Sequence, residues 1–299
     1  MGIVRKIAQH PEKVLQVLID GERMSFLPDR RFLQMEYYAF LGKKLNLENP
    51  TTFNEKMQWL KLYNRRPEYT MMADKYLVRE YIAKTLGEEY LIPLLGVWDD
   101  PDEIDFDKLP DQFVLKCNHN SGTGMCICKD KFKLDIAKVR QELKRGLKEN
   151  YYLMHREWPY RDIPRKIVCE QYMDDGSGEL KDYKFMCFNG EPKCSFVCSD
   201  RFSPEGLKVT FYDMDWKIMP FERHYPHSEV PIKKPQSYEE MVRLAEVLAK
   251  GIPFVRVDFY EIDGHPYFGE LTFFPGSGYE EFSPEEWDST LGEWIHLTK

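Results

Sequence analysis

Two acidic residues and one arginine in the last quarter of the chain have the types and spacing of a metal site. Arg256, Asp258 and Glu270 lie in two apolar runs joined by a turn containing Asp263-Gly264. A hairpin here would place Asp258 and Glu270 on neighbouring strands, with Arg256 projecting from the same face as Asp258. Two adjacent carboxylates repel each other unless a cation lies between them. The pattern therefore predicts a Mg²⁺ ion that holds a phosphorylated substrate. A surface ladder of alternating charges is the alternative, although the apolar surroundings of both acids favour the metal site.

A phosphate-binding loop is predicted near the middle of the chain. Lys116 lies close to the end of an apolar run, and the glycine-rich segment Ser121-Gly-Thr-Gly124 follows it. Backbone N–H groups of such a loop can approach phosphates without obstruction by side chains. The spacing matches neither a P-loop nor a dinucleotide-binding motif. An ordinary hairpin turn with incidental serine and glycine remains open.

A third candidate site is the apolar run 166–172, which contains Glu170 and Tyr172 and precedes the glycine-rich turn 174–178. A linker of this kind could bind adenine through its backbone and ribose through the carboxylate. An ordinary edge strand explains the same residues equally well.

The elements that must position these residues predict an α+β protein. Helices are expected at 31–41, after the capping box Thr52–Glu55, after Asp74, at 136–147, at 238–248 and from Ser283. Strands are expected at 113–117, 125–128, 166–172, 183–188, 194–198 and 209–216, with Asn189-Gly190 as a hairpin turn. We predict a helical N-terminal region (1–110), a first lobe (111–172) and a second lobe with the metal site (173–299).

Composition and charge exclude several classes of protein. The 299 residues are 42% hydrophobic and 14% aromatic, which is typical of a packed globular chain. A net charge of −8 argues against a nucleic-acid binder, and no apolar run approaches the roughly 20 residues of a membrane span. The first ten residues are too polar for a signal peptide. The seven cysteines lack zinc spacing and indicate small buried side chains in a reducing compartment. A cytoplasmic protein is expected.

Taken in order, these motifs resemble the ATP-grasp superfamily. Arg256-Val-Asp258-Phe and Glu270-Leu-Thr-Phe-Phe-Pro-Gly276 are similar to the metal-binding end of D-alanine–D-alanine ligases. The wider sequence resembles the TupA-like (teichuronopeptide-synthesis) ATP-grasp family of bacterial surface-polysaccharide clusters. The segments that carry this resemblance are Phe53-Asn-Glu-Lys-Met-Gln-Trp59, Leu109-Pro-Asp-Gln-Phe-Val-Leu-Lys-Cys-Asn-His119, Ser121-Gly-Thr-Gly124 and Asp182-Tyr-Lys-Phe185. The resemblance implies an ATP-grasp fold, in which two α+β lobes grip ATP, after a helical N-terminal region.

The resemblance also implies roles at the metal end of the site. Asp258 and Glu270 would hold Mg²⁺. Thr272 would be a weaker third ligand, because the superfamily usually has asparagine at this position, and the number of metal ions stays open. Arg256 would steady an acyl-phosphate or its tetrahedral successor, and Lys184 would project into the nucleotide cleft.

At the nucleotide end, the resemblance implies that Lys116 contacts the phosphates of ATP, with Lys75 as a weaker candidate. Residues Ser121, Gly122, Thr123 and Gly124 would form the flexible phosphate loop. Glu170 and Tyr172 would lie at the adenine hinge.

The expected function is an ATP-dependent carboxylate–amine or carboxylate–amino-acid ligase in bacterial surface or capsular polysaccharide biosynthesis. Its acceptor would be a small or glycan-linked carboxylate or a sugar, and polysaccharide-assembly enzymes are candidate partners. Three alternatives stay open: a kinase acting on a sugar hydroxyl, a glycosyltransferase that uses Asp213-Met-Asp215, and a non-catalytic binding protein. His119 is the first candidate for proton transfer, ahead of His224 and His227, against a plain loop histidine.

Overall fold

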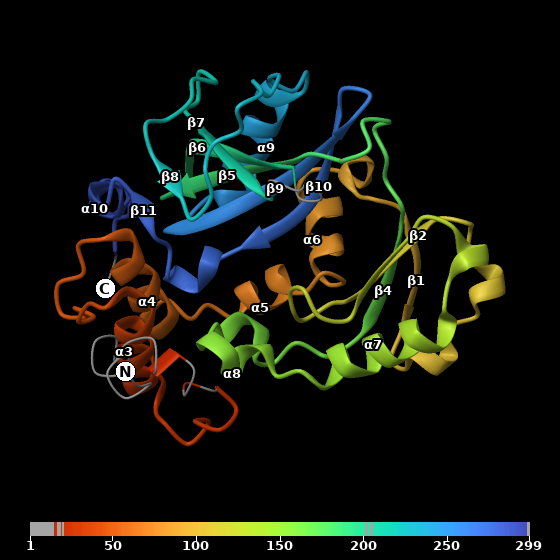
Figure 1. Ribbon diagram of the computed structural model, residues 1–299, viewed down its shortest axis with the longest axis horizontal. Coiled ribbons are helices and arrows are strands. Elements are labelled where there is room, and N and C mark those ends of the chain that lie inside the picture. The colour runs from red at the N-terminus through yellow and green to blue at the C-terminus, as the bar shows by residue number, and fades with distance from the viewer. Residues whose placement is uncertain (1–14, 17–18, 20, 201–202, 204–205, 298–299) are drawn as a thin grey trace, which may run out of the picture.

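Two antiparallel sheets with helices packed against them form the α+β architecture that the sequence predicts (Figure 1). The computed structural model describes residues 15–16, 19, 21–200, 203 and 206–297. The first ten residues, on which the expectation about a signal peptide rests, lie outside this described part, as does the start of the predicted helical region. No described helix is long and apolar enough to cross a membrane.

The first sheet has four strands in the order β1-β4-β2-β3. These are β1 (Leu94–Trp98), β2 (Phe113–Cys117), β3 (Met125–Cys128) and β4 (Ile167–Gln171). The helix α7 (Ile136–Lys148) covers one face, where Val139 and Leu143 join Phe113 and Leu115 in one buried cluster. Because side chains alternate along a strand, the opposite face carries Lys116 and Glu170, among others. Strand β1 was not predicted and lies within the stretch assigned to the helical N-terminal region.

The second sheet has five strands in the order β10-β9-β5-β6-β7. These are β5 (Asp182–Phe188), β6 (Glu191–Ser199), β7 (Lys208–Tyr212), β9 (Phe254–Ile262) and β10 (His265–Thr272). The helix α9 (Tyr238–Ala249) covers one face, and the ring of Phe185 lies 5.5 Å from that of Tyr238. In Figure 1, α9 lies on the other side of this sheet from α5 and α8. The face opposite α9 is therefore the one that carries Lys184, Arg256 and Asp258.

The N-terminal region contains helices, of which α4 packs against the C-terminal end of the chain. These helices are α3 (Asp29–Leu41), α4 (Phe53–Tyr63), α5 (Glu68–Ala73) and α6 (Val78–Thr85). The predicted capping box at Thr52 and Glu55 is confirmed at the start of α4. Side chains of α4 reach the C-terminal segment: Asn54 donates to the carbonyl of Glu280 at 2.8 Å, and Lys61 donates to that of Ser277 at 2.8 Å. The helical region is therefore part of the same packed body as the second sheet.

Two local predictions were wrong. The strand expected at 209–216 ends at Tyr212, because the next residues form a turn in which the amide of Asp213 donates to the carbonyl of Lys217. Ser283 does not cap the last helix but belongs to β11 (Phe282–Ser283), which pairs with β8 (Glu222–Arg223). The last helix, α10 (Glu286–Glu293), begins three residues later. The division of the chain at residues 111 and 173 stays a prediction.

Candidate active site

Strand register brings the predicted carboxylate pair together. Asp258 on β9 is the direct partner of Glu270 on β10, and Lys184 on β5 pairs with Asp258 from the other side. The Arg256 guanidinium donates to both Asp258 oxygens at 2.7 Å and to Glu270 at 2.8 Å. The hairpin geometry expected from the sequence is confirmed, and four charged side chains form one compact cluster.

Lys184 is buried within this cluster and contacts two carboxylates. Its side-chain ammonium donates to Asp258 and lies 2.9 Å from Asp182. Burial acting alone would lower the pKa of Lys184, but Asp182 and Asp258 raise it above its usual value. Lys184 therefore carries a positive charge at neutral pH and lies against the buried Asp258 carboxylate.

Glu270 is the more accessible of the two paired acids. Its side chain is 42% exposed, whereas that of Asp258 is 1% exposed. Burial acting alone would raise the pKa of Glu270, but the cations Arg256, Lys184 and Lys75 outweigh it and hold the value at about 2. Glu270 is thus ionised at neutral pH and presents its carboxylate to the space between the sheets.

The oxygen atoms at this end of the sheet fit a hard cation. Asp258 and Glu270 supply adjacent carboxylates, and the Thr272 hydroxyl donates to Glu270 at 3.1 Å. Among the residues that the structure describes, no three His, Cys, Asp or Glu side chains gather as a metal-binding group. Mg²⁺ commonly takes only one or two carboxylates, with substrate phosphates and waters as its other ligands. The pair therefore suits Mg²⁺ that arrives with a nucleotide better than a cage built entirely from protein.

The glycine-rich loop between β2 and β3 is anchored at its base and exposed at its tip. The amide of Cys117 donates to the carbonyl of Gly124 at 3.0 Å, and the Asn120 amide donates to the Glu149 carboxylate at 2.8 Å. Ser121 and Gly122 are exposed. This arrangement leaves the backbone of the tip accessible, which a phosphate-binding loop requires.

We expect Gly124→Ala to destabilise the protein by about 2–4 kcal/mol and Gly122→Ala by only about 1–2 kcal/mol. Both glycines have positive φ, +66° and +82°, so both variants strain the backbone. A Cβ at position 124 would also lie 2.6 Å from the Cys117 sulfur and 2.9 Å from the Gly146 Cα, whereas position 122 has nothing within 4 Å. Denaturant unfolding of the two variants measures the difference. Equal losses would contradict the close packing at Gly124.

On the four-stranded sheet, Lys116 and Glu170 are bound to each other. The Lys116 ammonium lies 2.6 Å from Glu170, and Arg79 of α6 lies 3.2 Å from the other oxygen of the same carboxylate. Arg79 was not predicted, because nothing in the local sequence indicates that α6 packs beside β4. Glu170 therefore forms ion pairs with two cations, Lys116 from β2 and Arg79 from α6.

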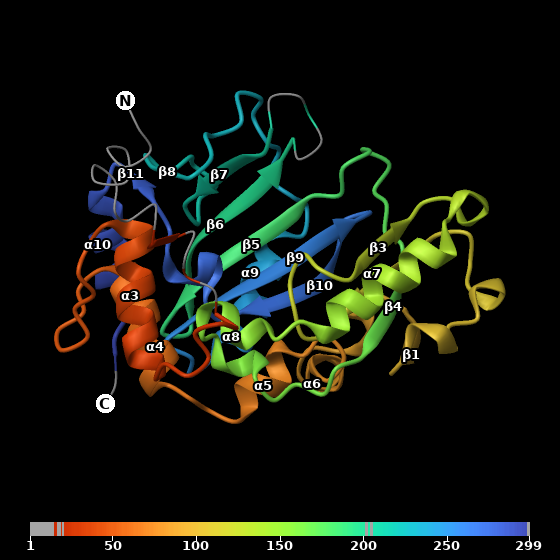
Figure 2. The ribbon, with the colours of Figure 1, turned by 60° about the horizontal axis from the view of Figure 1, so that its bottom comes forward.

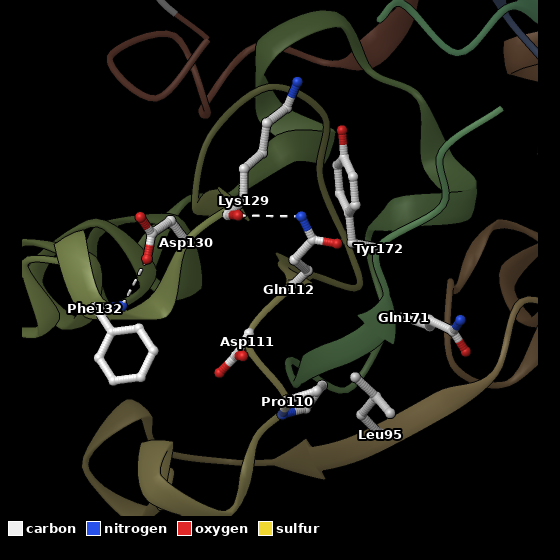
Figure 3. Close-up of a pocket in the computed structure, with 9 residues that line it drawn as sticks. All are labelled: Leu95, Pro110, Asp111, Gln112, Lys129, Asp130, Phe132, Gln171 and Tyr172. Atoms are coloured by element: carbon white, nitrogen blue, oxygen red, sulfur yellow. Dashed lines mark hydrogen bonds between the residues drawn. The ribbon is translucent and has the colours of Figure 1, made fainter. Parts of the chain in front are cut away.

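Tyr172 lies just beyond β4, beside a surface pocket of about 710 Å³ (Figure 3). In Figure 3, the Tyr172 ring stands next to Lys129 and Gln112, whereas Gln171 points to the other side of the strand. The Lys129 ammonium lies 5.6 Å from the centre of the Tyr172 ring. Because β2 runs from this end to the glycine-rich loop, Tyr172 and the loop lie at opposite ends of the β2–β3 hairpin.

Lys75 connects the two halves of the site. Its ammonium donates to the carbonyl of Asn120 at 2.5 Å, next to the glycine-rich loop. Burial lowers the pKa of Lys75, the charge of Glu270 raises it, and the charge of Lys116 lowers it further. Lys75 is therefore close enough to both Glu270 and Lys116 to interact with their charges, while it bonds next to the loop.

The other candidate residues make local contacts. His119 is 2% exposed, and one of its ring nitrogens lies 3.2 Å from the carbonyl oxygen of Glu149. Burial lowers the pKa of His119 to about 4. Asp213 accepts from the amides of Asp215 and Lys217 and so closes a turn. His224 lies beside Glu280 and Glu281, and His227 is joined to Glu222 through its amide.

One sheet carries the glycine-rich loop, the other carries the carboxylate pair, and both carry cations. Together these features define an ATP-grasp protein. The chain belongs to the TupA-like ATPgrasp family, whose model matches residues 55–296.

Solved structures of other ATP-grasp proteins are similar to the chain, and no curated protein matches it. D-alanine–D-alanine ligase from Bacillus anthracis, in complex with ATP, is 16% identical with a TM-score of 0.42, over 68% of this chain and 55% of that one. The Helicobacter pylori D-alanine–D-alanine ligase is 14% identical with a TM-score of 0.45, over 81% of this chain and 69% of that ligase. A RimK domain ATP-grasp protein from Sphaerobacter thermophilus is 10% identical with a TM-score of 0.43, over 78% of this chain and 70% of that protein. The chain thus spans little more than half of the Bacillus anthracis ligase, and the family assignment rests on the sequence match.

Proposed function

We propose that the protein is an ATP- and Mg²⁺-dependent carboxylate–amine ligase. The observation that carries the proposal is the direct pairing of Asp258 with Glu270 beside Arg256. Lys75, Lys116 and the glycine-rich loop supply positive charge and backbone donors for phosphates on the other side. Membership of the TupA-like ATPgrasp family supports the use of ATP.

Each part of the site has a defined task in this proposal. Asp258 and Glu270, with the Thr272 hydroxyl beside them, would hold Mg²⁺, which neutralises phosphate charge when bound. Lys116, Lys75 and residues 121–124 would bind the phosphates, and Tyr172 would lie at the adenine end. Arg256 and Lys184 would keep Asp258 ionised, and Arg256 would also stabilise negative charge that develops on the reacting carboxylate.

The reaction would proceed in two displacements. A carboxylate oxygen of the substrate attacks the γ-phosphorus, and the bond from that phosphorus to ADP breaks. An amine nitrogen then attacks the carbonyl carbon of the acyl-phosphate, phosphate leaves, and the nitrogen loses a proton. No protein nucleophile is needed, since positioning and charge neutralisation carry the chemistry. A role in bacterial surface or capsular polysaccharide biosynthesis, in the cytoplasm and beside polysaccharide-assembly enzymes, belongs to the same proposal.

The test is ADP release with hydroxylamine as a general amine. The protein is incubated with Mg-ATP, hydroxylamine and each member of a panel of uronic acids and amino acids, and ADP and hydroxamate are both measured. Carboxylate-dependent formation of the two in equal amounts is expected. Amide formation without carboxylate-dependent ADP release would sink the proposal. A phosphorylated sugar formed without any amine would instead identify a kinase, and Mg-ATP binding with no turnover would identify a binding protein.

A further inference from the structure

One segment of the chain crosses from the glycine-rich loop to the carboxylate pair. It contains α8 (Tyr151–His155) and the 3₁₀ helix η5 (Trp158–Tyr160). In both ribbon views α8 lies between α7 and α4 (Figures 1 and 2). None of the roles assigned above uses this segment.

Both ends of the segment are fixed to parts of the candidate site. At its start, Glu149 accepts from Asn120 at 2.8 Å and from Thr123 of the glycine-rich loop at 3.4 Å. Further along, Glu157 accepts from the Ser277 hydroxyl at 2.6 Å, in the segment that follows β10. The residues between 149 and 157 therefore run from the glycine-rich loop to the segment that follows β10.

Aromatic stacking fixes the end of the segment beside β10. Tyr69 of α5 packs between two rings, 6.3 Å from Trp158 and 4.3 Å from Phe273, and Phe273 directly follows the last residue of β10. This places η5 near Thr272 and Glu270. The charges of Glu270 and Arg256 accordingly act on both Tyr151 and Tyr160.

Tyr151 and Tyr160 form a pair with unused hydroxyls. Their ring centres are 4.8 Å apart at an angle of 73°, and both residues are half-buried. Within the described residues, neither hydroxyl has a hydrogen-bond partner, and neither is shut off from solvent. Because these hydroxyls are open to solvent, water or a bound molecule can hydrogen-bond to them.

We propose that Tyr151 and Tyr160 form the acceptor subsite and bind a hydroxylated ring, so that the carboxylate substrate is a sugar acid; this rests on the proposed function. The rings offer apolar surface to the C–H faces of a sugar, and the hydroxyls can both donate to and accept from its hydroxyl groups. The pair has no formal charge, and the nearby Glu157 is 3% exposed and already bonded. The ammonium group of an amino-acid substrate would need a carboxylate partner, and Glu270, whose charge acts on the pair, is already bonded to Arg256 and would hold Mg²⁺.

The experiment measures hydroxamate formation from glucuronate, galacturonate and mannuronate, and from glutamate, with Mg-ATP and hydroxylamine. Turnover of at least one uronic acid is expected, in preference to glutamate. Tyr151→Phe and Tyr160→Phe should each raise the KM for that uronic acid about tenfold, because each loses one hydrogen bond. The Kd for Mg-ATP and the thermal midpoint should not change.

Tyr38→Phe is the matched control, since this tyrosine is 42% exposed on α3. It should leave the KM unchanged. Preference for glutamate, turnover of no uronic acid, or an unchanged KM in both Tyr151→Phe and Tyr160→Phe would overturn the inference. Failure of the wild-type protein to bind Mg-ATP, or ADP release that needs no carboxylate, would overturn the proposed function instead.

Discussion

Replacing Glu270 by glutamine should lower Mg²⁺-dependent ATP turnover about a thousandfold while leaving the fold intact. An amide oxygen is a much weaker ligand for Mg²⁺ than a carboxylate. The glutamine oxygen can still accept from Arg256 and Thr272, which now donate to Glu270 at 2.8 and 3.1 Å. The 42% exposure of this side chain makes the substitution tolerable for packing.

ADP release at a series of Mg²⁺ concentrations, together with the thermal midpoint, measures both parts of this expectation. Glu239→Gln is the control, because Glu239 is an exposed carboxylate that is also paired with a single cation, Lys234. Turnover in Glu270→Gln that equals that of the unmodified protein at every Mg²⁺ concentration, low ones included, would mean that this carboxylate is not a metal ligand.

Asp258→Asn should abolish turnover and also destabilise the protein by about 3 kcal/mol. The Asp258 side chain is 1% exposed and accepts from both Arg256 and Lys184. Glu270 and Asp182 would still neutralise part of the charge on these cations. The loss should therefore fall at the lower end of the range for a broken buried ion pair.

The double variant Asp258→Asn/Lys184→Met tests the cause of this instability. Removing the Lys184 ammonium removes one of the buried cations that Asp258 neutralises, so the double variant should recover part of the lost stability. Denaturant unfolding of the unmodified protein, the two single variants and the double variant gives the coupling free energy between Asp258 and Lys184. A double variant that loses the sum of both single effects would show that the charges are not coupled.

The hairpins of this protein were predictable because their signals are local. The turns at Asn189-Gly190 and Asp263-Gly264 lie between strands that pair directly with each other, and the carboxylate pair follows from that pairing. Strand β1 was missed because its partner β4 lies far away in the chain. The contact of Arg79 with Glu170 was missed for the same reason, since it depends on how α6 packs.

The candidate site shows the same difference between residues that have a local sequence signal and residues that are placed by long-range packing. Arg256, Asp258 and Glu270 on neighbouring strands, and the glycine-rich loop between two strands, were named as site residues from the sequence, whereas Asp182 beside Lys184 was not. Tyr151 and Tyr160 could not be named, because a short helix among polar residues has no periodic pattern that points to a site. Their position becomes visible only through the contacts of the residues around them, those of Glu149 before Tyr151 and those of Glu157 and Trp158 before Tyr160.

The hydrogen bonds between α4 and the C-terminal segment have a consequence for synthesis on the ribosome. The bonds of Asn54 and Lys61 join residues that are 226 and 216 positions apart. A growing chain therefore exposes α4 long before the residues that it binds have been made. Long-range contacts of this kind form late and leave apolar surface uncovered meanwhile. We therefore expect nascent chains that stop before residue 277 to need chaperones, even when all four strands of the first sheet have been made.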